Sequence, residues 1–248
     1  MRRTLLILAA LAVFAAAVAA FAPAVLVGTP LERISGGRLG LAEAEGTIWR
    51  GRGTLVASRE ARLPLAWSID PWPLLCGELR LSLFPYDANG TAPHGEIALR
   101  EGTVALRGLD LALPADLLRV ALPGTGLRAT GGVRVTSSAL DWAPTGSRGE
   151  ALIVWRDARI AAGSGDALEL GSVTAVLSAT GDRLTGPVAN EGGNVGVRGN
   201  VSLRARTAEL SLLLAPHRAD DAALARSLAA IGTPDGAGWR VEWRAGTR

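Results

Sequence analysis

Few side chains in this sequence combine the type and the spacing that chemistry requires. His94 and His217 are the only histidines, and Cys76 is the only cysteine. A metal site, or a nucleophile with its base, needs such groups in a recognisable cluster, whereas here they lie far apart along the chain. The sequence motifs of serine hydrolases, zinc proteases and phosphate-binding loops are also absent. The sequence therefore predicts no catalytic residue, no cofactor and no metal ion.

Structural roles account for these residues more simply. Cys76 follows Leu74 and Leu75, which predicts a small, buried apolar side chain. Asp220 and Asp221 precede a helical pattern, where carboxylates cap the backbone and interact favourably with the helix dipole. Because one cysteine allows no intrachain disulfide, the fold depends on the hydrophobic core that 248 residues can bury.

Tryptophan is the conspicuous aromatic residue, with seven copies against one tyrosine and three phenylalanines. Most of the seven stand at apolar positions of alternating segments, which favours packing within a sheet. The alternative is that some of them line a groove that faces lipid or another protein. The seven are Trp49, Trp67, Trp72, Trp142, Trp155, Trp239 and Trp243.

The charge distribution argues against nucleic acid as a partner. All 26 basic side chains are arginines, and two of them, Arg2 and Arg3, precede an uncharged segment. The remaining 24 arginines face 23 carboxylates, so the rest of the chain is nearly neutral. Nucleic-acid binding requires clustered positive charge that displaces counterions.

An uncharged run over residues 4–27 predicts a membrane anchor, because it is long enough to cross a bilayer as a helix. Its members include Thr4, Leu5, Phe14, Phe21 and Val27. Arg2 and Arg3 precede the run, so the positive-inside rule keeps the N-terminus in the cytoplasm and exports the rest. We therefore expect a single-pass protein of the bacterial inner membrane, with a cytoplasmic tip and anchor in residues 1–27. A cleaved signal peptide that ends near Ala20-Phe21-Ala22 is the alternative.

Residues 28–248 form the predicted periplasmic part, in which apolar and polar residues alternate. Leu79, Leu81 and Leu83 are one such series, and glycines stand near the expected turns. This alternation is typical of antiparallel strands with one buried face. We expect a mainly β fold in which the transmembrane helix precedes an extended, twisted antiparallel sheet or sandwich.

Two segments predict short helices within this β region. Residues 114–120 have proline in the first turn, and residues 220–231 place leucines on one face before a glycine and a proline. Trp239, Val241 and Trp243 then alternate as a closing strand. Residues 140–149 are a candidate boundary between two half-domains.

A short motif near the start of the β region resembles the hallmark of a known family. The motif residues are Gly46, Thr47, Ile48, Trp49, Arg50 and Gly51, followed by Leu63 and Trp67. Together with the anchor, the length and the C-terminal helix and strand, they resemble protein N of the type II secretion system over essentially the whole chain. The resemblance implies an accessory inner-membrane component that supports export of folded periplasmic proteins across the outer membrane. It would act through contacts with other inner-membrane and periplasmic components of that system.

The motif residues themselves indicate structure rather than chemistry. Gly46 and Gly51 permit a tight turn, a bulge or a close approach of two strands. Trp49 is predicted to anchor the first strand in the core.

A second hypothesis is an AsmA-like envelope protein that binds or transfers lipid along an amphipathic β groove. An anchored, twisted sheet with one apolar face suits this function too, and a long, uncovered apolar face would favour it. A soluble periplasmic enzyme is a third hypothesis, which the missing active site disfavours.

Overall fold

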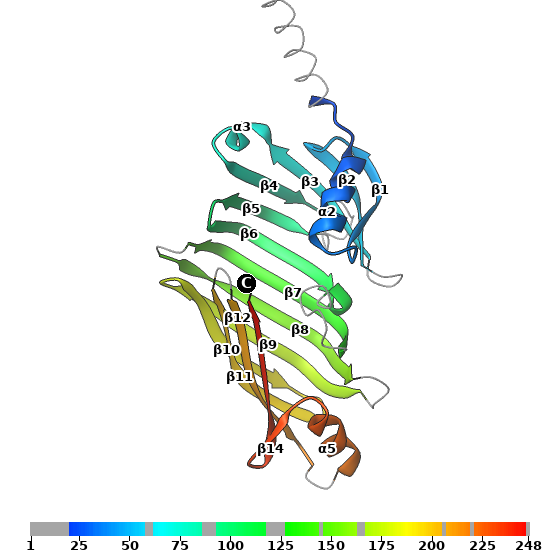
Figure 1. The fold of residues 1–248 in the computed structure, drawn as a ribbon, viewed down its shortest axis with the longest axis vertical. Coiled ribbons are helices and arrows are strands. Elements are labelled where there is room, and N and C mark those ends of the chain that lie inside the picture. The colour runs from blue at the N-terminus through cyan, green and yellow to red at the C-terminus, as the bar shows by residue number, and fades with distance from the viewer. Residues whose placement is uncertain are drawn as a thin grey trace, which may run out of the picture.

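The computed structural model describes residues 20–57, 62–85, 93–117, 127–143, 146–162, 167–204, 207–218 and 221–246. Within these ranges the chain forms one 14-stranded sheet, which Figure 1 shows as a long, twisted ribbon of strands. All strand pairs are antiparallel, and spatial order follows chain order except that β14 lies between β12 and β13. The prediction of a mainly β fold with a twisted antiparallel sheet is confirmed.

The elements have the following bounds. The strands are β1 (Gly40–Gly46), β2 (Arg50–Val56), β3 (Arg62–Asp70), β4 (Glu78–Phe84), β5 (His94–Arg100), β6 (Thr103–Pro114), β7 (Leu127–Trp142), β8 (Arg148–Ala162), β9 (Leu168–Thr180), β10 (Arg183–Glu191), β11 (Val195–Arg204), β12 (Thr207–Pro216), β13 (Thr233–Asp235) and β14 (Gly238–Gly246). The helical elements are η1 (Ala24–Val27), α2 (Gly28–Ile34), α3 (Pro71–Leu74), η2 (Ala115–Leu117) and α5 (Ala222–Ala229).

The strand register carries one apolar face across the whole sheet. Leu81 of β4 lies opposite Ile97 of β5, and Ile97 lies opposite Leu106 of β6. Because side chains alternate along each strand, the other face receives the polar residues, and Arg134 pairs there with Asp110.

Bulges bend the long strands and increase their twist. The register between β7 and β8 shifts at Gly131, which adopts a φ of +113°. A Cβ at this position would lie 2.4 Å from the carbonyl oxygen of Arg156, so the close approach requires glycine. Such bulges allow the apolar face to curl toward itself.

The main core lies in the C-terminal half of the sheet, between β7 and β14. Figure 1 shows α5 at the end of this half that is opposite α3. Leu224 and Leu228 of α5 belong to the same buried cluster as Val195 and Leu214. In the N-terminal half, the leucines of β4 are only half-buried.

The predicted membrane anchor lies mostly outside the described residues, which start at Ala20. No helix within the described ranges has the length and apolar character needed to span a membrane. The predicted anchor extends through Phe21 to Val27, but these described residues do not form one continuous helix. Phe21 lies in an exposed turn, Pro23 is extended and forms a β-bridge with Thr47, and Val27 ends η1. Proline lacks an N–H and disfavours helix in the preceding residue, which explains the break.

The other predicted features fall close to their expected positions. In the segment 114–120, Pro114 ends β6 and η2 follows, while residues 118–120 lie outside the described ranges. The helix predicted at 220–231 is the shorter α5, and the Asp221 side chain accepts a hydrogen bond from the backbone N–H of Leu224. Residues 140–149, where a boundary between half-domains was predicted, contain the end of β7 and the start of β8, with residues 144–145 outside the described ranges.

Candidate functional site

The predicted family motif forms the turn between β1 and β2. The backbone N–H of Thr47 donates to the carbonyl oxygen of Arg50 at 2.8 Å, and the Arg50 N–H donates to Oγ1 of Thr47 at 3.1 Å. Gly46 precedes this turn with a φ of +89°, and a Cβ there would lie 2.5 Å from the Arg50 carbonyl oxygen. This close approach in the left-handed region requires glycine at position 46.

Trp67 fills the space that Gly51 leaves open. A Cβ on Gly51 would lie 2.5 Å from Cζ2 of Trp67, which is the residue opposite it on β3. Only 5% of Trp67 is exposed, and its Nε1–H donates to the carbonyl oxygen of Ile48 at 3.1 Å. Leu63, on the same face of β3, is also buried. The indole thus locks the β1–β2 turn onto the third strand.

The same turn holds the chain that enters the sheet from the N-terminal side. The backbone N–H of Ile48 donates to the carbonyl oxygen of Ala22 at 2.9 Å, and Pro23 bridges Thr47. Ala24, the next residue, is buried. We call this arrangement of residues 22–24, 46–51 and Trp67 the junction, because it ties the N-terminal segment to the sheet.

Trp49 does not have the core position that the sequence predicted. It lies in the bend before β2 and is half-buried, although its carbonyl oxygen accepts a hydrogen bond from the Ile69 N–H at 2.6 Å. Its place in the turn, one residue before β2 begins, keeps it outside the buried core. The tryptophan that packs inside is Trp67, which the sequence identified as part of the motif without a separate role.

An open groove of about 1120 Å³ adjoins the junction. Its walls come from the chain at Ala20, the turn at Trp49, the helix α3 with Trp72, and the ends of β3, β4 and β5. The strands contribute polar and charged side chains, namely Ser68, Asp70, Arg80, Ser82 and Glu96. Asp70 caps α3 by accepting a hydrogen bond from the Trp72 N–H at 3.1 Å. Trp72 and Leu75 are 75% and 79% exposed.

Cys76 lies in the turn after α3 and is exposed, so the prediction of a buried cysteine was wrong. The apolar run Leu74-Leu75-Cys76 was interpreted as core, but it lies beyond the end of β3 and before β4, where no second layer covers it in the described part of the chain.

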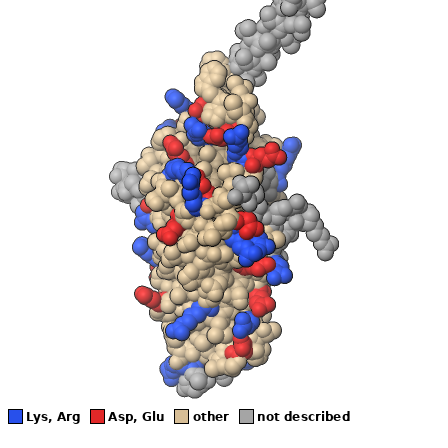
Figure 2. Space-filling view, turned by 90° about the vertical axis from the view of Figure 1, so that its left-hand side faces the viewer, with Lys and Arg blue, Asp and Glu red and all other residues tan. Residues whose placement is uncertain are grey.

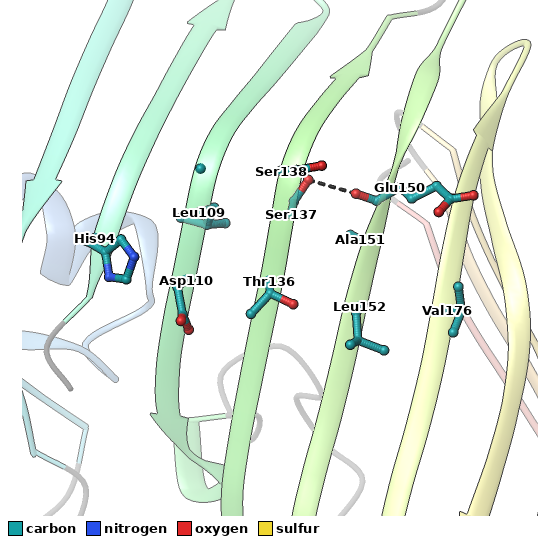
Figure 3. A pocket seen from close by; sticks show the side chains of 11 residues that line it. His94, Leu109, Asp110, Thr136, Ser137, Ser138, Glu150, Ala151, Leu152 and Val176 are labelled. Carbon is teal, nitrogen blue, oxygen red and sulfur yellow. Dashed lines mark hydrogen bonds between the residues drawn. The ribbon is translucent and has the colours of Figure 1, made fainter. Parts of the chain in front are cut away.

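A second hollow, of about 400 Å³, is lined by a histidine, an aspartate and a serine, the side chains that form the catalytic triad of serine hydrolases. Figure 3 shows His94, Asp110 and Ser137 on three neighbouring strands, with β6 between the histidine and the serine. The Ser137 hydroxyl donates to the Glu150 carbonyl oxygen at 2.7 Å, and Nδ1 of His94 is buried without a hydrogen-bond partner. Since the hydroxyl is directed to a carbonyl and not to a base, this geometry does not activate a nucleophile. The other histidine, His217, is exposed, and its Nδ1 lies 3.2 Å from the Gly193 carbonyl oxygen.

Ion pairs organise the polar face beside this hollow. A hydrogen bond from Arg134 holds the pKa of Asp110 below its ordinary value, and Arg107 acts on the pKa of Asp141 in the same way. Both carboxylates therefore stay ionised at neutral pH. On the side of the molecule that Figure 2 shows, acidic and basic side chains are interspersed.

Within the described ranges, no three His, Cys, Asp or Glu side chains are grouped closely enough to hold a metal ion. The family described as type II secretion system (T2SS), protein N, matches residues 37–241, a span that includes the whole glycine–tryptophan turn. Neither the curated proteins nor the solved structures contain a significant match.

Proposed function

The chain belongs to the type II secretion system protein N family, which links it to type II secretion, and we propose that it acts there as an accessory inner-membrane component. In this proposal residues 4–20 form a single transmembrane helix with the N-terminus in the cytoplasm. Such a helix would be roughly 25 Å long, which is near the minimum for one crossing. The sheet then lies in the periplasm and supports export through contacts with other secretion components.

The junction is the observation that carries this proposal. Backbone bonds from Ala22 and Pro23 to the motif turn leave only one or two residues of slack after Ala20. A sheet tied so closely to an anchor holds a defined position relative to the membrane, whereas a freely diffusing domain needs no such attachment. The polar face, with exposed arginines paired to partly buried carboxylates, offers a broad surface for protein contacts. We infer that the protein acts by binding and not by catalysis.

The test separates the anchor from the domain in a strain that lacks the gene. Three forms of the protein are expressed. The first is the full-length chain, and in the second a cleavable signal peptide replaces residues 1–20. In the third, an unrelated apolar helix replaces residues 4–19. We expect the released domain to be folded in the periplasm yet to leave type II substrates there, because its attachment is lost. The unrelated helix, as the matched control, should restore secretion.

Immunoblots of the medium and the periplasm measure the substrates, and alkaline washing of membranes measures the attachment. Secretion at the wild-type level by the released domain would contradict the role of the anchor. Normal secretion in the strain that lacks the gene would show that type II secretion does not require this protein.

The continuous apolar face favours one second candidate, an AsmA-like protein that binds lipid along the sheet. Leu99 lies on this face, opposite Leu79 and Val104, and is 40% exposed. A partly open apolar face on a long sheet is a natural site for an acyl chain.

Site-specific photo-crosslinking from the full-length chain distinguishes the two candidates. A benzophenone amino acid at position 99 probes the apolar face, and the same group at position 213 is the control, because Leu213 is 39% exposed but lies on the polar face opposite Arg198. Under the secretion proposal, we expect neither position to give a lipid adduct in mass spectrometry. A lipid adduct at position 99 alone would support the lipid-binding candidate.

A further inference from the structure

Two groups of exposed apolar side chains lie at the end of the molecule where the described chain begins, one in the first described residues and one at α3. Helix α3 and the first described residues share this end in Figure 1, and Ala20, Trp72 and Leu75 line the same groove. We call these exposed side chains the end patch. Its members are Phe21, Val25, Leu26, Trp72, Leu74 and Leu75.

Nothing in the local fold requires these side chains to be apolar. Trp72 and Leu75 belong to a one-turn helix and its C-cap that contribute little to the core, and both are more than 70% exposed. An apolar cluster that is left in water marks a surface that binds something. Its occupant must reach both the N-terminal segment and α3.

The position of the patch indicates the occupant. The sequence before Ala20 is uncharged back to Thr4, and the junction fixes residues 22–24 to the sheet. If residues 4–20 cross the bilayer, Phe21 leaves it at the membrane surface, and α3 is held beside that point. Tryptophan is enriched at membrane interfaces, where its ring meets acyl chains and its N–H meets water and headgroups. Arg50, which is exposed and lines the groove, can meet lipid phosphates there.

We propose that the end patch lies in the outer leaflet of the inner membrane, with Trp72 and Leu75 in the interface between headgroups and acyl chains. This inference rests on the proposed anchor and adds a second membrane contact to it. Two contacts orient the sheet on the bilayer, because a single helix leaves rotation about its own axis and tilt unrestrained. The far end, with α5, then extends into the periplasm.

Cys76 provides a native probe for this contact. It is the only cysteine, it is exposed, and it directly follows Leu75. The full-length chain is labelled there with an environment-sensitive fluorophore and reconstituted into vesicles of phosphatidylethanolamine and phosphatidylglycerol. We expect a blue-shifted emission that is largely lost when nitroxide-labelled lipids are included.

The matched control moves the label to the opposite end. In a Cys76→Ser background, Ala230→Cys places it in the exposed turn after α5. We expect this label to emit as it does in water and to resist quenching by the lipids. Because the Cys76 probe needs no substitution, loss of folding does not explain a negative result.

The possible outcomes separate this inference from the proposed function. If alkaline washing leaves the chain in the membrane but Cys76 is as water-exposed as position 230, the inference is overturned and the anchor stands. If the label is shielded only when other secretion proteins are added, the patch binds protein and the inference is again overturned. Release of the chain by alkaline washing would contradict the anchor and this contact together.

Discussion

Replacement of Trp67 by alanine should lower the free energy of unfolding by about 3–5 kcal/mol, as truncation of a buried aromatic side chain does. Trp67 is almost completely buried against Gly51, and its indole N–H satisfies the carbonyl oxygen of Ile48. The substitution removes the ring, leaves a cavity under the motif turn and takes away that hydrogen bond. Urea denaturation of the full-length chain in detergent micelles, followed by far-ultraviolet circular dichroism, measures the change.

Two other tryptophans at the same end serve as matched controls. Trp49→Ala and Trp72→Ala delete the same side chain from half-buried and exposed positions. We expect Trp72→Ala to change the free energy of unfolding by about 0.5 kcal/mol or less. Trp49→Ala should fall between the other two. If Trp49→Ala destabilised the protein as much as Trp67→Ala, the assignment of Trp67 as the residue that locks the turn would be wrong.

The order of these effects also bears on function. Trp67 supports the turn that binds Ala22 and Pro23, so its loss should loosen the attachment of the sheet to the N-terminal segment. Trp72, in contrast, can be removed without disturbing that turn, because α3 contacts mainly the start of β4. A secretion defect in Trp72→Ala with normal stability would point to a surface role at this end.

Sequence periodicity predicted the strands well because a long sheet with one apolar face imposes a period of two. The strand β4 contains Leu79, Leu81 and Leu83 at alternate positions, as predicted. The strand β14 contains Trp239 and Val241 in the same alternation. The continuous sheet, however, depends on pairing between distant residues. Proline and glycine between two strands are found at a hairpin and at a domain boundary alike, so the sequence around Pro144 does not distinguish the two.

The two tryptophans of the motif show what periodicity cannot resolve. Apolar and polar residues alternate next to both Trp49 and Trp67, so the sequence alone predicts a core position for each of them. Their difference arises from register: Gly51 lies opposite Trp67 and leaves room for its ring, while Trp49 stands one residue before β2 begins. The pairing of a strand glycine with a tryptophan on the next strand was the signal that identifies the buried one.

The error at Cys76 has a different physical origin. An apolar run such as Leu74-Leu75-Cys76 is favourable both in a core and at a lipid surface, and composition does not separate the two environments. Pro71 and Pro73 around Trp72 were the available signal, because they disfavour a central strand and place this run at the sheet end.

Glycines within strands also carry structural information, because they mark places where another backbone comes close. Gly186, for example, admits the Val176 carbonyl oxygen at a position where a Cβ would be 1.8 Å away.

The second large effect is expected from Leu228→Ala in α5, at the opposite end of the sheet. Leu228 is completely buried, in the cluster that contains Val195 and Leu214. Its truncation should lower the free energy of unfolding by about 2–5 kcal/mol, because the surrounding strands cannot close the cavity completely. Leu213→Ala is the control, since this leucine lies on the polar face opposite Arg198 and is 39% exposed. We expect the control to cost about 1 kcal/mol or less.

This comparison tests whether the C-terminal half of the sheet is filled by its own side chains. A large loss for Leu228→Ala means that α5 is a permanent part of the core, so its apolar face is filled by the side chains of the sheet. Urea denaturation in micelles gives the stability, and the Leu99 cross-link reports lipid on the open half in the same preparation. If Leu228→Ala unfolded like the wild type, α5 would be a movable cover over an apolar interior. That result would contradict the self-contained core and strengthen the lipid-binding candidate.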